Sequence, residues 1–252
     1  MVSMPLVSPK VDLCTPCLTE FHNHNILGGQ FLRAYVERYN HPPVHNLITF
    51  GSQHMGVSDI PPCRAHDFLC QVARNAAKSA VYSHWAQENI VTVGFWLTRL
   101  YHIFKLIQAQ YYRDPANLET YLSANHFLPD INNEIRGSRN KTYRSNLSSL
   151  NNLVLVMFTE DKTVIPKESS WFGAEAVDEE RKYGGLQIPL SNPSQRGIVP
   201  MRSQPIYLED WIGLRELDER GAIIFEECEG EHMRLGKCWE SLVETFTGGL
   251  EL

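Results

Sequence analysis

The sequence predicts an α/β protein built on a parallel sheet, and three observations support this expectation. Residues 29–39 repeat apolar side chains at helical spacing, and a short apolar strand at 44–50 follows directly. The run 153–158, Leu-Val-Leu-Val-Met-Phe, is continuously apolar, as in strands that are covered on both faces. A third strand is expected at 222–225. Helices that alternate with strands in this way are typical of open parallel sheets.

The chain has no periodic pattern before the first predicted helix. We therefore expect residues 1–26 to form a disordered head and residues 27–252 to form the folded domain. The helical pattern at 29–39 ends at Pro42-Pro43, because proline has no amide proton to donate. The strand at 44–50 ends at Gly51.

Residues 57–150 are mostly helical in pattern. Candidate helices lie at 68–80, 81–88 and 117–122, with Pro, Asn and Gly breaks between them. Such a block between two strands predicts a helical cap over the open edge of the sheet. After the last strand, an amphipathic helix is expected at 239–246.

Charge and cysteine content exclude one class of partner and favour one compartment. The chain has 23 Lys and Arg against 29 Asp and Glu and no basic run interleaved with aromatic residues, so nucleic acid is not an expected partner. Six cysteines and the sequons at Asn140 and Asn146 favour an oxidising, secretory compartment. Residues 1–10, however, lack the apolar core that a signal peptide needs. This N-terminus predicts either a cytosolic protein or a missing true start.

Charged side chains interrupt the most apolar stretch, 90–107. Arg99 and Lys105 would each cost about 2.5–3.5 kcal/mol near the middle of a bilayer. We therefore expect a soluble amphipathic helix here and no integral membrane span.

An acid and a histidine follow two of the predicted strands. Asp161 comes after the strand at 153–158, and His232 comes after the strand at 222–225. Parallel strands present their carboxyl ends at one edge of the sheet, so these side chains can meet there. In such a pair the carboxylate orients the imidazole, and the imidazole takes up the proton of a nucleophile. The alternative is that Asp161 forms a turn and His232 is a solvated loop residue.

The helix at 29–39 begins like the helix that follows the nucleophile of a serine hydrolase. In α/β hydrolases that serine lies in Gly-x-Ser-x-Gly, and serine, acid and histidine follow in this order along the chain. The five corresponding positions are His24, Asn25, Ile26, Leu27 and Gly28. Only Gly28 fits the motif. Ile26 has no group that can attack a carbonyl, and a β-branched residue disfavours the strained turn.

Four motifs together resemble the palmitoyl-protein thioesterase family of lysosomal α/β hydrolases. They are Gly28-Gly29-Gln30-Phe31-Leu32-Arg33-Ala34, Gln53-His54-x-Gly56-Val57, Trp171-Phe172-Gly173 and Glu229-Gly230-Glu231-His232. The resemblance runs from about Leu27 to the C-terminus. It implies an α/β-hydrolase fold with a helical cap insertion at about 57–150, with the N-terminal strands of that fold missing here.

The same resemblance implies an activity, a partner and a compartment. The activity is hydrolysis of the thioester that joins a fatty acyl chain to cysteine, and the substrates are palmitoylated proteins or fatty-acyl thioesters. The compartment is the lumen of the lysosome or vacuole. No cofactor and no metal are expected.

Site residues follow from the resemblance by position. The triad aspartate falls on Asp161 and the triad histidine on His232, while the serine position falls on Ile26. The backbone N–H of Leu27 would be one oxyanion donor.

Other positions are expected near the site or in structural roles. Gln53 and His54 are expected near the pocket, with no role assigned to them. Cys63 and Cys70 fall on a disulfide of the cap, and Asn140 falls on a glycosylated position.

Two segments depart from the family pattern. The head at 1–26 matches nothing that the catalytic machinery requires, and residues 92–107 have no counterpart. We interpret both as translated intron or a misjoined exon.

A zinc site and a second nucleophile are alternative interpretations of two local patterns. Cys14 and Cys17 with His22 and His24 supply zinc-ligand types, but the gap from cysteine to histidine is shorter than in zinc fingers, which favours an unstructured tail. Ser52 follows a strand and could replace the nucleophile, although it lacks the flanking glycines.

A second pair of cysteines frames the expected histidine. Cys228 could pair with Cys238, which would stabilise the loop of His232.

We expect no thioesterase turnover from this chain as written, because it lacks the nucleophile and a complete oxyanion hole. The alternative is a non-catalytic relative that binds acyl chains or proteins. Such a protein would keep the groove and the cap without the serine.

Overall fold

The computed structural model describes residues 11–14, 28–60, 67–83, 109–176 and 197–247. Its centre is a parallel sheet in the order β1-β2-β3-β6. The strands are β1 (Val11–Cys14), β2 (Val44–Phe50), β3 (Asn152–Phe158) and β6 (Ile223–Cys228). This arrangement confirms the predicted mixed α/β class with a parallel sheet.

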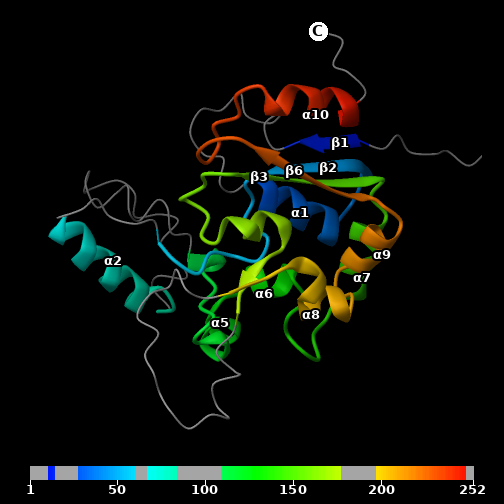
Figure 1. Cartoon of the computed structure of the whole chain (residues 1–252). Coiled ribbons are helices and arrows are strands. Elements are labelled where there is room, and N and C mark those ends of the chain that lie inside the picture. Colours follow the sequence, from blue (N-terminus) through cyan, green and yellow to red (C-terminus); the bar gives the residue numbers. More distant parts are fainter. Residues whose placement is uncertain (1–10, 15–27, 61–66, 84–108, 177–196, 248–252) are drawn as a thin grey trace, which may run out of the picture.

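Helices cover both faces of the sheet (Figure 1). Helix α10 (Cys238–Thr247) lies on one face, and α1 (Gly28–Arg38), α7 (Lys141–Ser148) and α9 (Leu214–Glu219) lie on the other.

Strand β3 is buried on both faces because its alternate side chains enter two different cores. Leu153 and Leu155 pack with residues of α1, α7 and α9, whereas Val154, Val156 and Phe158 pack toward α10. The continuous apolar pattern at 153–158 therefore predicted this central position correctly.

The remaining described elements are four helices, three 3₁₀ turns and a pair of two-residue strands. The helices are α2 (Phe68–Ala80), α5 (Leu118–Ala124), α6 (Leu128–Ile131) and α8 (Pro205–Leu208). Three 3₁₀ turns are η3 (Ala109–Tyr111), η4 (Lys167–Trp171) and η7 (Met201–Ser203). A second, antiparallel pair joins β4 (Ala174–Glu175) to β5 (Ile198–Val199).

Side-chain caps set the starts of two helices. The Asp67 carboxylate accepts a hydrogen bond from the backbone N–H of Cys70 and begins α2. The side-chain oxygen of Asn140 accepts from the N–H of Thr142 and begins α7. Helix α7 packs beside α1 on the sheet. Part of the helical block at 57–150 therefore belongs to the helical layer on this face of the sheet.

The structure differs from the sequence-based expectations at three places. Residues 11–14 form β1, paired in parallel with β2, so the predicted disorder of the head does not hold for these four residues. Residues 81–83 form a turn, and the rest of the helix expected at 81–88 lies outside the described residues. The last strand continues to Cys228 instead of ending at residue 225.

No helix in the described part of the chain is long and apolar enough to cross a membrane. The apolar stretch at 92–107 lies outside the described residues. The cap and the missing N-terminal strands stay predictions.

Candidate active site

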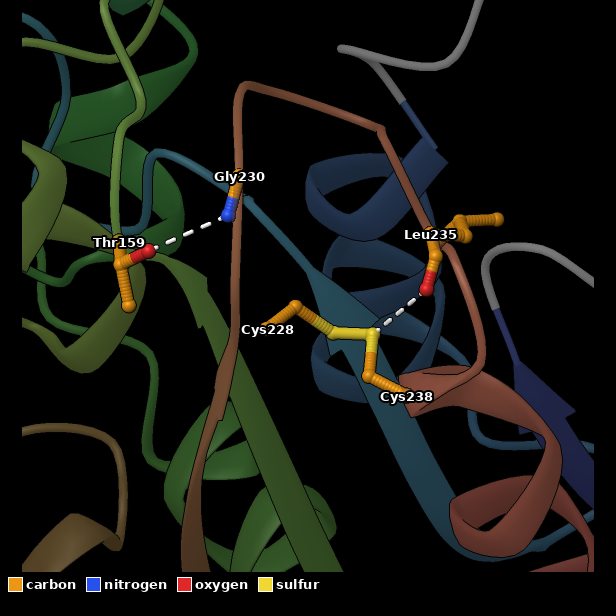
Figure 2. Close-up of a disulfide and its surroundings, with 5 residues drawn as sticks. All are labelled: Thr159, Cys228, Gly230, Leu235 and Cys238. Carbon is orange, nitrogen blue, oxygen red and sulfur yellow. Dashed lines mark hydrogen bonds between the residues drawn. A yellow bond between two sulfur atoms is a disulfide. The ribbon is translucent and has the colours of Figure 1, made fainter.

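The carboxyl ends of β3 and β6 are held together by hydrogen bonds. The strands are neighbours, with Phe158 opposite Cys228 in register. Beyond them, the N–H of Thr159 donates to the carbonyl of Cys228 at 3.0 Å, and the N–H of Glu160 donates to the carbonyl of Gly230 at 2.9 Å. The N–H of Gly230 donates in turn to Thr159 Oγ1 (Figure 2). The segments leading to the candidate acid and histidine are therefore joined before either side chain is reached.

Asp161 and His232 meet at this edge of the sheet. Oδ2 of Asp161 lies 2.6 Å from Nδ1 of His232. The other carboxylate oxygen accepts from the backbone N–H groups of Thr163, at 2.8 Å, and Val164, at 2.9 Å. Because both oxygens are bonded, the carboxylate has a fixed orientation, and it can hold the imidazole with its proton on Nδ1.

Phe158 and Gly51 also lie against the imidazole of His232. Its ring stands edge-on to Phe158 at 5.9 Å between centroids. A Cβ on Gly51 would lie 3.0 Å from both Nδ1 and Cε1 of the imidazole, and Gly51 has φ +56°. Glycine is therefore required here both by the backbone conformation and by the space that the histidine needs.

The second ring nitrogen of His232, Nε2, makes no hydrogen bond in the described part of the chain. It is buried, and 9% of the side chain is exposed. This is the nitrogen that takes the proton of the nucleophile in a triad. Ile26 and Leu27, the expected nucleophile and oxyanion positions, lie outside the described residues.

Ser52 is buried against the start of α1. Its Oγ stands where a Cβ on Gly29 would otherwise be, so the serine fills the space that this glycine leaves. That packing gives Ser52 a structural reason for its position at the end of β2.

Gln53 and His54 belong to a buried polar cluster, which we define as Gln30, Arg33, Gln53, His54 and Asn132. Arg33 donates to Asn132 Oδ1 at 2.8 Å and to Gln30 Oε1 at 3.0 Å. Gln30 donates to the backbone carbonyl of Gln53. The sequence showed Arg33 within a motif, but its burial depends on contacts 99 residues apart along the chain, which no local pattern reveals.

His54 is surrounded very differently from His232. It stacks on Phe172 with centroids 4.6 Å apart, and its Nε2 lies 3.0 Å from Thr49 Oγ1. Burial, with the Arg33 charge nearby, lowers the pKa of His54 well below its ordinary value. We expect this histidine to stay neutral.

The structure places the cysteines as follows. Cys228 and Cys238 form a disulfide, as the sequence suggested (Figure 2). Cys70 also takes part in a disulfide, but its expected partner Cys63 lies outside the described residues.

The ligands of the possible zinc site fall largely outside the described residues. Cys17, His22 and His24 lie there, while the backbone of Cys14 forms the end of β1. Within the described ranges, no group of three His, Cys, Asp or Glu residues could hold a metal ion.

The two sequons lie at opposite ends of α7. Asn140 is exposed at its start. Asn146 is half-buried, and its Nδ2 donates to the backbone carbonyl of Glu37 in α1 at 2.9 Å.

A parallel sheet with an acid and a histidine paired at its carboxyl edge is the arrangement of α/β hydrolases. A family model described as palmitoyl protein thioesterase matches residues 26–232. The chain therefore belongs to the palmitoyl-protein thioesterase family.

Curated relatives agree with this assignment. Palmitoyl-protein thioesterase 1 of Caenorhabditis elegans is 38% identical over 82% of this chain and 59% of its own length. Palmitoyl-protein thioesterase 3 of Dictyostelium discoideum is 34% identical over 79% of this chain and 56% of its own length. A lysosomal thioesterase PPT2 homolog of Drosophila melanogaster is 32% identical over 78% of this chain and 56% of its own length. The chain thus spans less than two thirds of these relatives.

Proposed function

We propose that this chain is a palmitoyl-protein thioesterase-like protein that has the acid and base of a catalytic triad but no nucleophile at the serine position. The observation that supports this most directly is the 2.6 Å contact between Asp161 and His232, with Nε2 of the histidine buried and unpartnered among the described residues. Ile26 stands at the serine position and offers no attacking atom.

The proposed chemistry of the intact site is acyl transfer without a cofactor. A serine oxygen would attack the thioester carbonyl while His232 takes up its proton. The histidine would then return that proton to the departing cysteine thiolate, leaving an acyl-enzyme. Water, deprotonated by the same nitrogen, would release the fatty acid. Asp161 would hold the imidazole in the required tautomer and stabilise its charged form.

Without the serine this cycle cannot begin. Removing the nucleophile alone costs about 10⁶ in turnover in subtilisin. We therefore propose that the chain as written has no thioesterase turnover above background. The substrate class would be palmitoylated proteins or fatty-acyl thioesters, and the lysosomal lumen would be its compartment, since some relatives are named lysosomal thioesterases.

The test is a parallel measurement of labelling and turnover. The purified chain, its Ile26→Ser variant and an Ile26→Ser/His232→Ala variant are treated with a fluorophosphonate probe and with a palmitoyl thioester. The original chain should show neither labelling nor turnover. Labelling of Ile26→Ser that disappears in the double variant would support the proposed roles. Labelling of Ser52 with turnover in the original chain would contradict them.

A second candidate function is non-catalytic binding of acyl chains. A pocket of about 440 Å³ lies between η4, η7 and β6. Its lining is mostly apolar, with Trp171, Met201 and Phe225, and it also includes Glu168 and Arg202. Such a lining suits an acyl chain better than a polar ligand. Saturable binding of a fluorescent fatty acid to the original chain, weakened by Phe225→Asp and unaffected by His232→Ala, would favour this function. Absence of saturable binding would exclude it.

A further inference from the structure

A disulfide closes the loop that contains His232. Cys228 is the last residue of β6, Cys238 is the first residue of α10, and their Cα atoms lie 5.6 Å apart. Figure 2 shows this bond joining the strand to the helix, near the hydrogen bond between Gly230 and Thr159. The candidate base therefore lies inside a covalently closed ring of chain.

The two halves of this loop are attached differently. Up to Gly230, the loop is hydrogen-bonded to the segment that follows β3. After His232, the backbone hydrogen bonds of the described residues stay within the loop, from Arg234 to Glu231 and from Cys238 to Leu235.

The second half of the loop therefore depends on a small set of attachments. In the part of the chain that the structure describes, these are the disulfide and the apolar contacts that Met233 and Leu235 make with the core under α10. Cys228 is fully buried in that core, so the bond connects the loop to the interior of the fold.

We propose that the Cys228–Cys238 disulfide positions His232 for proton transfer. It fixes the far end of the loop, so that Nδ1 of His232 stays on the Asp161 carboxylate and Nε2 stays turned away from it. The inference rests on the roles proposed for Asp161 and His232. The two sulfurs touch no reacting atom and act through the loop.

Reduction of the bond gives a direct way to test this role. A water-soluble phosphine transfers two electrons to the disulfide, the two sulfurs each take up a proton, and the phosphine becomes its oxide with an oxygen from water. The products are two thiols, and the ring around His232 is open.

The measurement is the solvent exchange of the His232 Nδ1 proton, followed by NMR in the full chain labelled with ¹⁵N-histidine. Asp161→Asn identifies the resonance, because it removes the carboxylate acceptor. We expect exchange to become faster by about tenfold or more in the reduced protein and in Cys228→Ser/Cys238→Ser, since the opened loop samples detached states. Reoxidation should restore the slow rate.

Cys70→Ser is the matched control, because it also removes a disulfide cysteine, in α2. It should leave the exchange rate unchanged, and phosphine should still accelerate exchange in this variant. If the double serine variant fails to fold, the reduced original chain decides the question. An unchanged exchange rate after reduction would overturn the proposal, and so would global unfolding on reduction, seen by circular dichroism.

A second readout separates this inference from the proposed function. In the Ile26→Ser background, loss of the disulfide should lower kcat for a palmitoyl thioester and leave KM unchanged, because substrate contacts remain. If Ile26→Ser has no turnover while reduction still releases the Nδ1 proton, the proposed activity is wrong and the positioning role stands. If turnover is present and neither kcat nor proton exchange responds to reduction, the positioning role is wrong.

Discussion

Two histidines of this fold have opposite surroundings. His232 faces a carboxylate, with Nδ1 2.6 Å from Asp161, and its second nitrogen has no partner among the described residues. His54 faces a hydroxyl and a cation, with Nε2 3.0 Å from Thr49 and the Arg33 charge nearby. Both rings contact a phenylalanine, but only that of His54 is stacked on it.

The two surroundings differ in burial and in the chemical partner of each ring, and both bear on what a histidine can do. A carboxylate stabilises the imidazolium that forms during proton transfer, which is the basis of the role proposed for His232. Burial, with the Arg33 charge as the smaller cause, lowers the pKa of His54, and the ring serves packing and hydrogen bonding.

The largest effect is expected from Arg33→Leu. Arg33 is fully buried, and its loss leaves Asn132 and Glu37 without their cationic partner. We expect the free energy of unfolding to fall by about 3–5 kcal/mol, measured by urea denaturation. Arg234→Leu, in an exposed side chain, should change it by less than about 0.5 kcal/mol. Equal effects would mean that the polar cluster does not support the fold.

Alanine substitutions at the two histidines should lower the free energy of unfolding by different amounts. His54→Ala removes a stacked, buried ring and is expected to cost about 2–4 kcal/mol of stability. His232→Ala should cost only about 1 kcal/mol, because Asp161 keeps its two backbone hydrogen bonds. Thermal and urea unfolding measure both. A reversed order would contradict the assigned surroundings.

Loss of the Cys228–Cys238 bond should destabilise the chain moderately. The bond closes a loop with a sequence separation of 10, for which chain entropy predicts about 2–3 kcal/mol. Urea denaturation of Cys228→Ser/Cys238→Ser measures it. A cost near zero would indicate that the reduced loop keeps its structure.

The most specific effect concerns pH, and it is measured as a slope rather than as one change in stability. Burial outweighs the attraction of Arg33 and raises the pKa of Glu37 from 4.5 to about 8. The folded state holds this proton more tightly than the unfolded state. The contribution of the Glu37 proton to the free energy of unfolding is therefore complete below pH 4.5, and it is lost as the pH rises toward 8.

The slope for one proton is about 1.4 kcal/mol per pH unit within that window. Glu37→Gln should remove it, and urea denaturation at several pH values measures the difference between the two chains. An identical pH dependence in both chains would show that Glu37 titrates normally.

The sequence predicted much of the sheet because its strands are marked by local patterns. Residues 44–50 and 153–158 are apolar runs with clear ends, and both are strands in the structure. Strand β1 was missed because Val11–Cys14 has only four residues and depends on pairing with β2. The same holds for β4 and β5, each of which is defined by its partner alone.

The pairing of Asp161 with His232 could be anticipated because both residues follow parallel strands. The buried cluster could not, because Arg33 and Asn132 are far apart in sequence and neither is unusual in its local context. Gly51 is a similar case. The need for glycine at this position comes from its contact with His232, which is far away along the chain.

The two sequons at the ends of helix α7 have different surroundings. The Asn146 side chain ties the helix to the last turn of α1 through the Glu37 carbonyl, while Asn140 projects from the exposed start of the helix. A glycan on Asn146 would have to share the nitrogen that makes this tie and to leave from between two packed helices. Asn140 is exposed among the described residues, so the fold distinguishes the two sequons.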